Sequence, residues 1–290
     1  MPNQKATAAD AAVANRTYRI SGGRVGVLLI HGLCGTPLEV RSVAIGLGHD
    51  GYAVHCPQIA GHGGTRQDLA KTSWKDWYRS VEVALEELLK ECDTVIVGGL
   101  CLGSILSLHL AANHPDKVRG VVLLSPMLWI NGWAIPWSMK LFTLVRWRWL
   151  ANLMLFPDPA SLGIKCTETR GLIRTRLANS HVSEFGTPGT PAVTILEYRW
   201  MVKEAMKILK GVRQPTLIVH AREDDFAHIS NAIYLQNQLS GAVDMVVLDD
   251  SYHVVTFDKE RHVVVARTRS FVSRVGQDMQ LAAAGAASVG

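Results

Sequence analysis

The chain has 290 residues, 48% of them hydrophobic and 19% charged, and a formal net charge of +5. This composition is that of a globular protein and excludes a largely disordered chain. The positive excess is small, and no block of Lys and Arg residues indicates a nucleic-acid partner. A chain of this length can bury a full hydrophobic core, as one domain with an insertion or as two domains.

The two ends of the chain differ from its centre in composition. Residues 1–16 are polar and alanine-rich and lack the apolar core of a signal peptide, which predicts a flexible leader. Residues 281–290 are low in complexity, and residues 277–290 are predicted to form a flexible tail. The five cysteines are odd in number and show no metal-binding spacing, so they indicate reduced thiols in a cytoplasmic protein.

Short apolar runs alternate with longer amphipathic ones along most of the chain. This alternation predicts a mostly parallel, doubly wound sheet covered by helices, and the Val, Ile and Leu content of the runs fits strands buried on both faces. The predicted strands, in chain order, are residues 25–30, 52–56, 94–98, 118–124, 215–221 and 244–248. The predicted helices are residues 37–47, 74–90, 102–113, 231–239 and 259–275.

The alternation stops between about residues 126 and 211. We therefore predict an α/β core, residues 17–126 and 211–276, with a cap or lid insertion over residues 127–210. Five of the eight tryptophans lie between residues 127 and 149, but polar residues interrupt this stretch too often for a membrane-spanning segment of about 20 apolar residues. The tryptophans either pack the cap onto the core or, with neighbouring cations, contact a lipid surface. Trp129, Trp133 and Trp137 are candidate substrate-binding residues.

A nucleophile motif joins a predicted strand to a predicted helix. The sequence Gly99-Leu-Cys-Leu-Gly103 has the form G-x-S-x-G of a nucleophile elbow, with cysteine in place of serine. The helix that follows would favour a thiolate at Cys101 through its free N–H groups and positive potential. A buried cysteine is more often an inert small hydrophobe, but the flanking glycines and the position of Cys101 favour a nucleophile.

Three further segments complete a hydrolytic site in the required chain order. The loop His31-Gly-Leu-Cys-Gly35 follows a strand, so the backbone amides of Leu33 and Leu102 are predicted to form an oxyanion hole. A strand leads into Asp224, and a later loop carries His253, the predicted general base that Asp224 orients. Other acids near these two segments are the alternatives for the role of Asp224: Asp225, Asp249 and Asp250.

Together these motifs resemble those of the bacterial carboxylesterase and monoacylglycerol-lipase branch of the α/β-hydrolases. The resemblance covers residues 25–274 apart from much of the cap, and it includes the Ala60-Gly-His-Gly63 segment. It implies an α/β-hydrolase fold with a helical cap and favours Asp224 as the acid, because that branch places the acid two residues after an arginine. The branch uses serine as nucleophile, so Cys101 departs from it.

The sequence therefore predicts hydrolysis of carboxylic esters, with thioesters as an alternative, through an acyl-Cys101 intermediate. The apolar cap favours medium to long acyl chains. No motif implies a metal or an organic cofactor, and the predicted partner is a small-molecule acyl ester. Three alternatives stay open: an acyltransferase with a cysteine nucleophile, a serine esterase whose serine has been replaced by cysteine, and a non-catalytic small-molecule receptor. The oligomeric state does not follow from the sequence.

Overall fold

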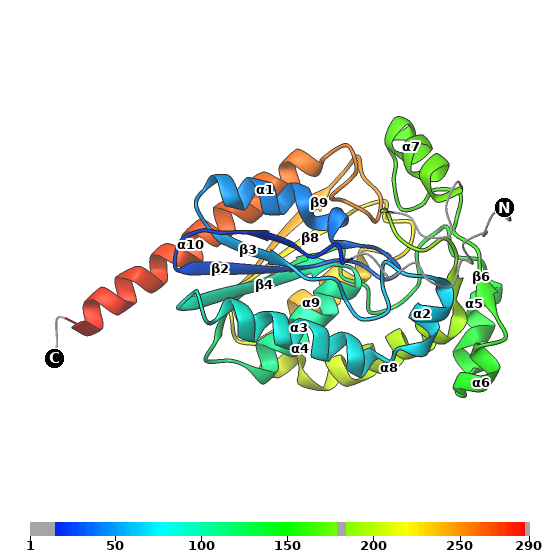
Figure 1. Cartoon of the computed structure of the whole chain (residues 1–290), viewed down its shortest axis with the longest axis horizontal. Helices are drawn as coiled ribbons and strands as arrows, with labels where there is room; N and C mark the ends of the chain where they lie inside the picture. Colours follow the sequence, from blue (N-terminus) through cyan, green and yellow to red (C-terminus); the bar gives the residue numbers. More distant parts are fainter. Residues whose placement is uncertain (1–14, 179–183, 288–290) are drawn as a thin grey trace, which may run out of the picture.

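A seven-stranded sheet forms the centre of the computed structural model, which describes residues 15–178 and 184–287 (Figure 1). The strand order is β1-β3-β2-β4-β5-β8-β9, and every neighbouring pair is parallel except β1 and β3. Helices α1 and α10 cover one face of the sheet, and α3, α4 and α8 cover the other (Figure 1). The α/β-hydrolase fold class expected from the sequence is confirmed.

All six predicted strands are present, with bounds that differ by at most a few residues. They are β2 (Val25–Ile30), β3 (Ala53–Cys56), β4 (Thr94–Leu100), β5 (Val118–Leu124), β8 (Thr216–Ala221) and β9 (Val243–Leu248). Sequence reasoning missed β1 (Tyr18–Ile20), which pairs with β3 at the edge of the sheet. A strand of three residues is too short to produce a hydrophobic pattern.

The five predicted helices are also present. They are α1 (Arg41–His49), which follows a 3-10 turn over Pro37–Val40, α3 (Trp74–Leu88), α4 (Leu102–Asn113), α9 (Ser230–Gln238) and α10 (Arg261–Ala287). Helix α4 is apolar on nearly all sides because it lies between the sheet and helices α3 and α8. A short helix, α2 (Arg66–Lys71), was not predicted.

The chain ends relate to their predictions in different ways. Helix α10 continues to Ala287, so most of the predicted tail, residues 277–290, is helical, and its flexibility stays a prediction. Residues 288–290 lie outside the described residues, as do residues 1–14 of the predicted leader.

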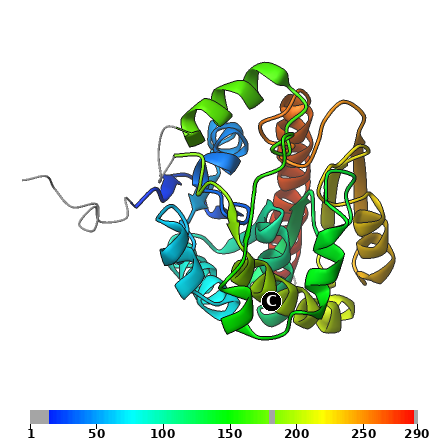
Figure 2. The same ribbon diagram turned by 90° about the vertical axis from the view of Figure 1, so that its right-hand side faces the viewer.

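The elements of the cap lie between β5 and α8, at the end of the molecule beyond the carboxyl ends of the parallel strands (Figures 1 and 2). They are α5 (Ser138–Leu141), a 3-10 turn (Phe142–Leu144), α6 (Arg148–Ala151), α7 (Thr167–Ala178) and the paired strands β6 (Leu155–Phe156) and β7 (Thr190–Pro191). None of the described helices combines the length and apolar character needed to cross a bilayer.

Helix α8 (Ala192–Ile208) was predicted as part of the cap, but it packs against α4 and α3. A small apolar cluster also joins it to the cap through Phe142 and Ala151. On this packing we propose to count α8 with the core and to end the cap near Pro191. The repeating strand-helix pattern of the sequence could not place this boundary, because α8 follows a long irregular segment rather than a strand of the main sheet.

The elbow between β4 and α4 approaches the end of β2 closely. A Cβ atom on Gly99 would lie 2.3 Å from the Ile30 carbonyl oxygen, and one on Gly103 would lie 2.1 Å from the same atom. Any side chain at either position would push two buried backbone segments apart. The two glycines of the motif are therefore a packing requirement of the fold.

We expect Gly103→Ala to lower the free energy of unfolding by about 2 kcal/mol, because overpacking a core typically costs 1–3 kcal/mol. Urea unfolding followed by circular dichroism measures the change. Gly171→Ala is the matched control, since Gly171 lies in helix α7 with nothing within 4 Å of an added Cβ. Equal effects of the two substitutions would contradict the packing requirement.

Candidate active site

Cys101 lies at the turn between β4 and α4. Its backbone has φ 52° and ψ −105°, a conformation that is strained for a residue with a side chain. The turn is held because the Cys101 N–H donates to the Leu124 carbonyl at 2.9 Å and the Ser104 N–H donates to the Cys101 carbonyl at 3.1 Å. The Cys101 side chain is only 6% exposed and lines an internal cavity.

The loop after β2 faces this turn. A Cβ on Gly32 would lie 3.7 Å from the Cys101 Cβ, and Leu33 lines the same cavity as Cys101. Within the described residues, the amides of Leu33 and Leu102 donate to no backbone acceptor. Two free N–H groups beside the nucleophile are what an oxyanion hole requires.

Two buried polar contacts fix the conformation of this loop. The His31 Nε2 accepts the Ile59 N–H at 3.2 Å, so His31 Nδ1 carries the proton and donates to the Gly32 carbonyl at 2.9 Å. Burial lowers the pKa of His31 to about 3, so the ring is neutral. On the other side, the Glu39 carboxylate accepts the Gly32 N–H at 2.7 Å, and its removal from water raises the pKa of Glu39 to about 7.

His253 and Asp224 form a buried pair. The His253 Nδ1 donates to the Asp224 carboxylate at 2.8 Å to Oδ2 and 3.0 Å to Oδ1. Asp224 Oδ1 also accepts the N–H groups of Phe226 at 2.9 Å and Ala227 at 2.7 Å. These donors follow β8 directly, so the turn after the strand holds the carboxylate while its other oxygen faces the imidazole.

The charges of the site shift the pKa values of this pair. Burial alone would lower the pKa of His253, but the charges of Asp224 and Cys101 outweigh it and raise the pKa well above its usual value. Burial would raise the pKa of Asp224, and the charge and hydrogen bond of His253 hold it below its usual value instead. The pair therefore favours an imidazolium beside a carboxylate.

The second ring nitrogen of His253, Nε2, takes no part in the contacts described above. His253 Nε2 is buried and has no hydrogen-bond partner within the described residues, while Cys101 lies close enough to act on the ring electrostatically. An unpaired buried nitrogen is costly unless a reacting group uses it. The structure thus brings together Cys101, Asp224 and His253 from the ends of three parallel strands.

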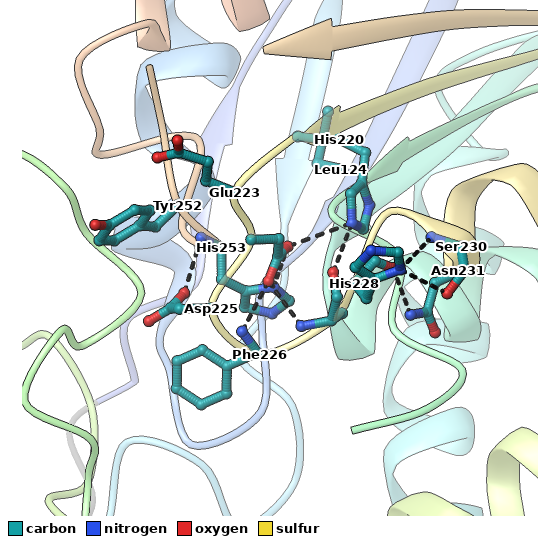
Figure 3. Close-up of polar contacts among 12 residues, drawn as sticks. Leu124, His220, Glu223, Asp225, Phe226, His228, Ser230, Asn231, Tyr252 and His253 are labelled. Carbon is teal, nitrogen blue, oxygen red and sulfur yellow. Dashed lines mark hydrogen bonds and ion pairs between the residues drawn. The ribbon is translucent and has the colours of Figure 1, made fainter. Parts of the chain in front are cut away.

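The alternative acids occupy other positions. Asp225 accepts the backbone N–H groups of His253 at 3.2 Å and Gly163 at 3.1 Å, which ties the histidine loop to the cap (Figure 3). Asp249 pairs with Arg222 at 2.6 Å, and Asp250 pairs with lysines on the surface. None of the three has a hydrogen bond to the His253 ring, so the geometry favours Asp224.

A cavity of about 320 Å³ opens beside Cys101 and His253. Its acidic side chains are Glu39 and Asp158, and no Lys or Arg is among its described lining residues. Most of the lining is apolar and comes from the cap, from α8 and from the loops after β8 and β9. These residues are Met127, Ile130, Ile135, Met139, Phe156, Ile164, Ile173, Ile195, Phe226 and Phe257.

The three predicted substrate-binding residues, Trp129, Trp133 and Trp137, lie outside this cavity. None of them lines it, and they are 38%, 62% and 73% exposed. The Trp133 indole N–H donates to the Glu223 carbonyl at 3.0 Å, so that ring is held on the outside. The segment is irregular, and residues between the tryptophans turn inward instead. Spacing in the sequence could not show which side of an irregular segment faces the core.

Sequence reasoning also missed two buried side chains that shape the site. Tyr198, on α8, donates from its hydroxyl to the Met127 carbonyl at 2.5 Å. Asp258 accepts four backbone N–H groups at 2.7–2.9 Å, from Lys165 and Cys166 in the cap and from Tyr252 and Lys259 around the histidine loop. The only feature of the sequence that points to Tyr198 is its polar hydroxyl within an apolar helix. No feature of the sequence points to Asp258.

The chain is similar to known lipases and esterases in sequence. A thermostable monoacylglycerol lipase of Bacillus sp. (strain H-257) is 30% identical over 258 residues, which cover 89% of this chain and 94% of the lipase. A carboxylesterase of Bacillus subtilis (strain 168) is 25% identical over 265 residues, 91% of this chain and 98% of the esterase.

Solved structures and a family model agree with this similarity. A structure of the metagenome-derived lipolytic enzymes LipS and LipT matches with a TM-score of 0.75 and 25% identity, covering 89% of this chain and 97% of that one. A monoglyceride lipase from Saccharomyces cerevisiae, 15% identical, shares the fold with a TM-score of 0.73, covering 89% and 90% of the two chains. The family model described as serine aminopeptidase, S33, matches residues 24–260. The chain therefore belongs to the serine aminopeptidase S33 family of α/β-hydrolases.

Proposed function

We propose that this chain hydrolyses carboxylic esters of medium to long acyl chains through an acyl-Cys101 intermediate. Because it is similar in sequence to the lipase and the carboxylesterase above, it is an esterase- or lipase-like hydrolase. The observation that carries the finer proposal is the buried His253–Asp224 pair, whose free Nε2 faces Cys101 at an apolar cavity. Thioesters fit the same chemistry as a second substrate class.

Each group of the site has a defined part in the proposed reaction. His253 Nε2 takes the proton of the Cys101 thiol, and the thiolate attacks the ester carbonyl while the Leu33 and Leu102 amides hold the oxyanion. Collapse expels the alcohol, which takes the proton from His253. A water molecule, deprotonated by His253, then attacks the thioester and releases the acid and Cys101. Asp224 keeps the Nδ1–H in place and stabilises the imidazolium throughout.

The charge pattern of the cavity supports an uncharged acyl chain. Carboxyl groups of Glu39 and Asp158 face the cavity without a balancing lysine or arginine among the described lining residues. A carboxylate on the acyl chain would be buried beside these two acidic side chains without a positively charged partner, which is costly. The apolar lining instead favours methylene groups, each worth about 0.8 kcal/mol when buried.

The exposed tryptophans support contact with a lipid surface. Trp133, Trp137, Trp147 and Trp149 are all more than half exposed. Residues 127–191 carry seven Lys or Arg residues against three Asp or Glu residues, so this segment is positively charged. Aromatic rings beside cations suit an anionic bilayer surface, where rings enter the headgroup region and cations meet phosphates, and the exposed Arg146 is next to Trp147 in the chain. We propose that the surface around Trp147 and Trp149 docks on anionic lipid.

We expect the purified protein to hydrolyse p-nitrophenyl octanoate with a higher kcat/KM than p-nitrophenyl acetate, because the longer chain fills the apolar cavity. Nitrophenolate release measures turnover, and Cys101→Ala should abolish it. A wide preference for acetate would contradict the proposed acyl chain length.

Intact mass recorded during the same reaction separates hydrolysis from acyl transfer. Hydrolysis predicts steady turnover with little acyl adduct. An acyl group that stays on the Cys101 peptide until an alcohol or amine is added would overturn hydrolysis in favour of transfer.

Cys101→Ser should slow turnover roughly 10²-fold if the pocket is shaped for sulfur, because small misplacement of a nucleophile has effects of that size. Faster turnover would indicate a site shaped for serine.

Asp224→Asn should lower kcat by roughly 10²–10⁴-fold with the fold intact, because an amide no longer stabilises the imidazolium or fixes its tautomer. Steady-state kinetics with the octanoate ester and a thermal melt measure the two effects. Asp249→Asn is the control, since Asp249 is exposed and pairs with Arg222. Full activity in Asp224→Asn would assign the acid role elsewhere.

We expect the protein to sediment with vesicles of phosphatidylcholine and phosphatidylglycerol, and less with phosphatidylcholine alone. The double substitution Trp147→Ala, Trp149→Ala should weaken binding several-fold, and salt should weaken it further by screening. Ile233→Ala on α9 removes an exposed apolar side chain outside the cap and serves as control. Binding that the tryptophan substitutions leave unchanged would refute docking through this face.

A further inference from the structure

Tyr198 is a buried phenol that the proposed reaction does not use. It lies on α8 and is 1% exposed, and its hydroxyl donates to the Met127 carbonyl at 2.5 Å. Met127 follows β5 and lines the cavity beside Cys101. The hydroxyl therefore reaches the site from the helical layer of the core, whereas the three proposed catalytic residues come from loops after strands.

Cys101 is the second neighbour of this hydroxyl. Helix α8 packs on α4, the helix that begins directly after Cys101, and the Tyr198 hydroxyl lies near enough to Cys101 for the two groups to interact electrostatically. Burial, together with the negative charge available at Cys101, raises the pKa of Tyr198 well above its usual value. The phenol thus keeps its proton at neutral pH and is a donor with two acceptors to choose between.

We propose that Tyr198 is a positioning residue that donates a hydrogen bond to the Cys101 thiolate. As the thiol proton moves to His253, the Tyr198 hydroxyl turns from the Met127 carbonyl to the sulfur. When the sulfur becomes acylated it loses its charge, and the hydroxyl returns to the carbonyl. Tyr198 keeps its own proton throughout, so no bond to oxygen is broken.

The geometry explains why such a donor suits cysteine. A cysteine site can hold its nucleophile ionised before substrate arrives, as a thiolate beside an imidazolium, whereas a serine hydroxyl stays neutral until attack. A hydrogen-bond donor to the resting thiolate therefore stabilises a cysteine site and not a serine site. Hydrogen bonds to charged groups are among the stronger ones in proteins, so removing this donor should have a measurable effect.

The inference rests on the proposed function only in treating Cys101 as the nucleophile, and its test needs no ester turnover. We would alkylate the protein with iodoacetamide between pH 6 and pH 10 and follow the Cys101 peptide by mass spectrometry. Tyr198→Phe should slow alkylation of Cys101 roughly 10- to 100-fold at pH 7, with a smaller difference at pH 10, which lies above the usual pKa of a thiol. Tyr234→Phe, a half-buried tyrosine on α9, should have no effect.

Two further measurements test the hydrogen bond from Tyr198 to Cys101. Replacing Tyr198 alone by 3-fluorotyrosine retains the ring and makes the phenol a stronger donor, so alkylation at pH 7 should become faster. In a Cys101→Ser background, Tyr198→Phe should cost less ester turnover than in the unchanged chain. A slowing of alkylation that is equal at all pH values, or no slowing, would overturn the proposal, as would an unchanged rate with 3-fluorotyrosine. If the unchanged protein showed no esterase activity but Tyr198→Phe still slowed Cys101 alkylation in the predicted pH-dependent way, only the proposed function would be refuted.

Discussion

The site depends on how closely the elbow after β4 approaches the end of β2. Gly99 and Gly103 leave no room for a side chain against the Ile30 carbonyl, and Cys101 between them adopts a positive φ. This approach brings the free amides of Leu33 and Leu102 beside the thiol. If the two segments lay farther apart, the proposed nucleophile and the proposed oxyanion donors would belong to different surfaces, so the packing of α4 on the sheet is itself a condition of the proposed chemistry.

Buried carboxylates join the loops that surround this elbow, and their partners decide what each one does. Asp224 accepts from a turn and from the His253 ring, so its charge acts on the imidazole. Asp225, the next residue, accepts from backbone on the histidine loop and the cap, and Asp258 accepts four backbone N–H groups from the same two regions. Identical side chains thus orient a base in one case and hold the cap against the histidine loop in the others.

The cap has two different faces. Its inner face supplies aliphatic side chains such as Ile130 and Met139 to the cavity, while its tryptophans lie outside. Large exposed aromatic side chains are uncommon on a surface that contacts only water, which is why we connect this face with lipid. Beneath the cap, α8 lines the cavity with Ile195 and holds the Met127 carbonyl through the Tyr198 hydroxyl.

The sequence by itself determined the order of most strands and helices along the chain and two residues of the proposed triad, Cys101 and His253. Those features depend on local periodicity and on motifs at strand ends, which neighbouring residues encode. The tertiary structure decided which of two adjacent aspartates faces His253 in this chain, that the tryptophans point outward, and that α8 packs on α4 and α3. These outcomes depend on contacts between segments far apart in sequence. An irregular cap and a buried Tyr198 or Asp258 therefore leave no periodic trace in the chain.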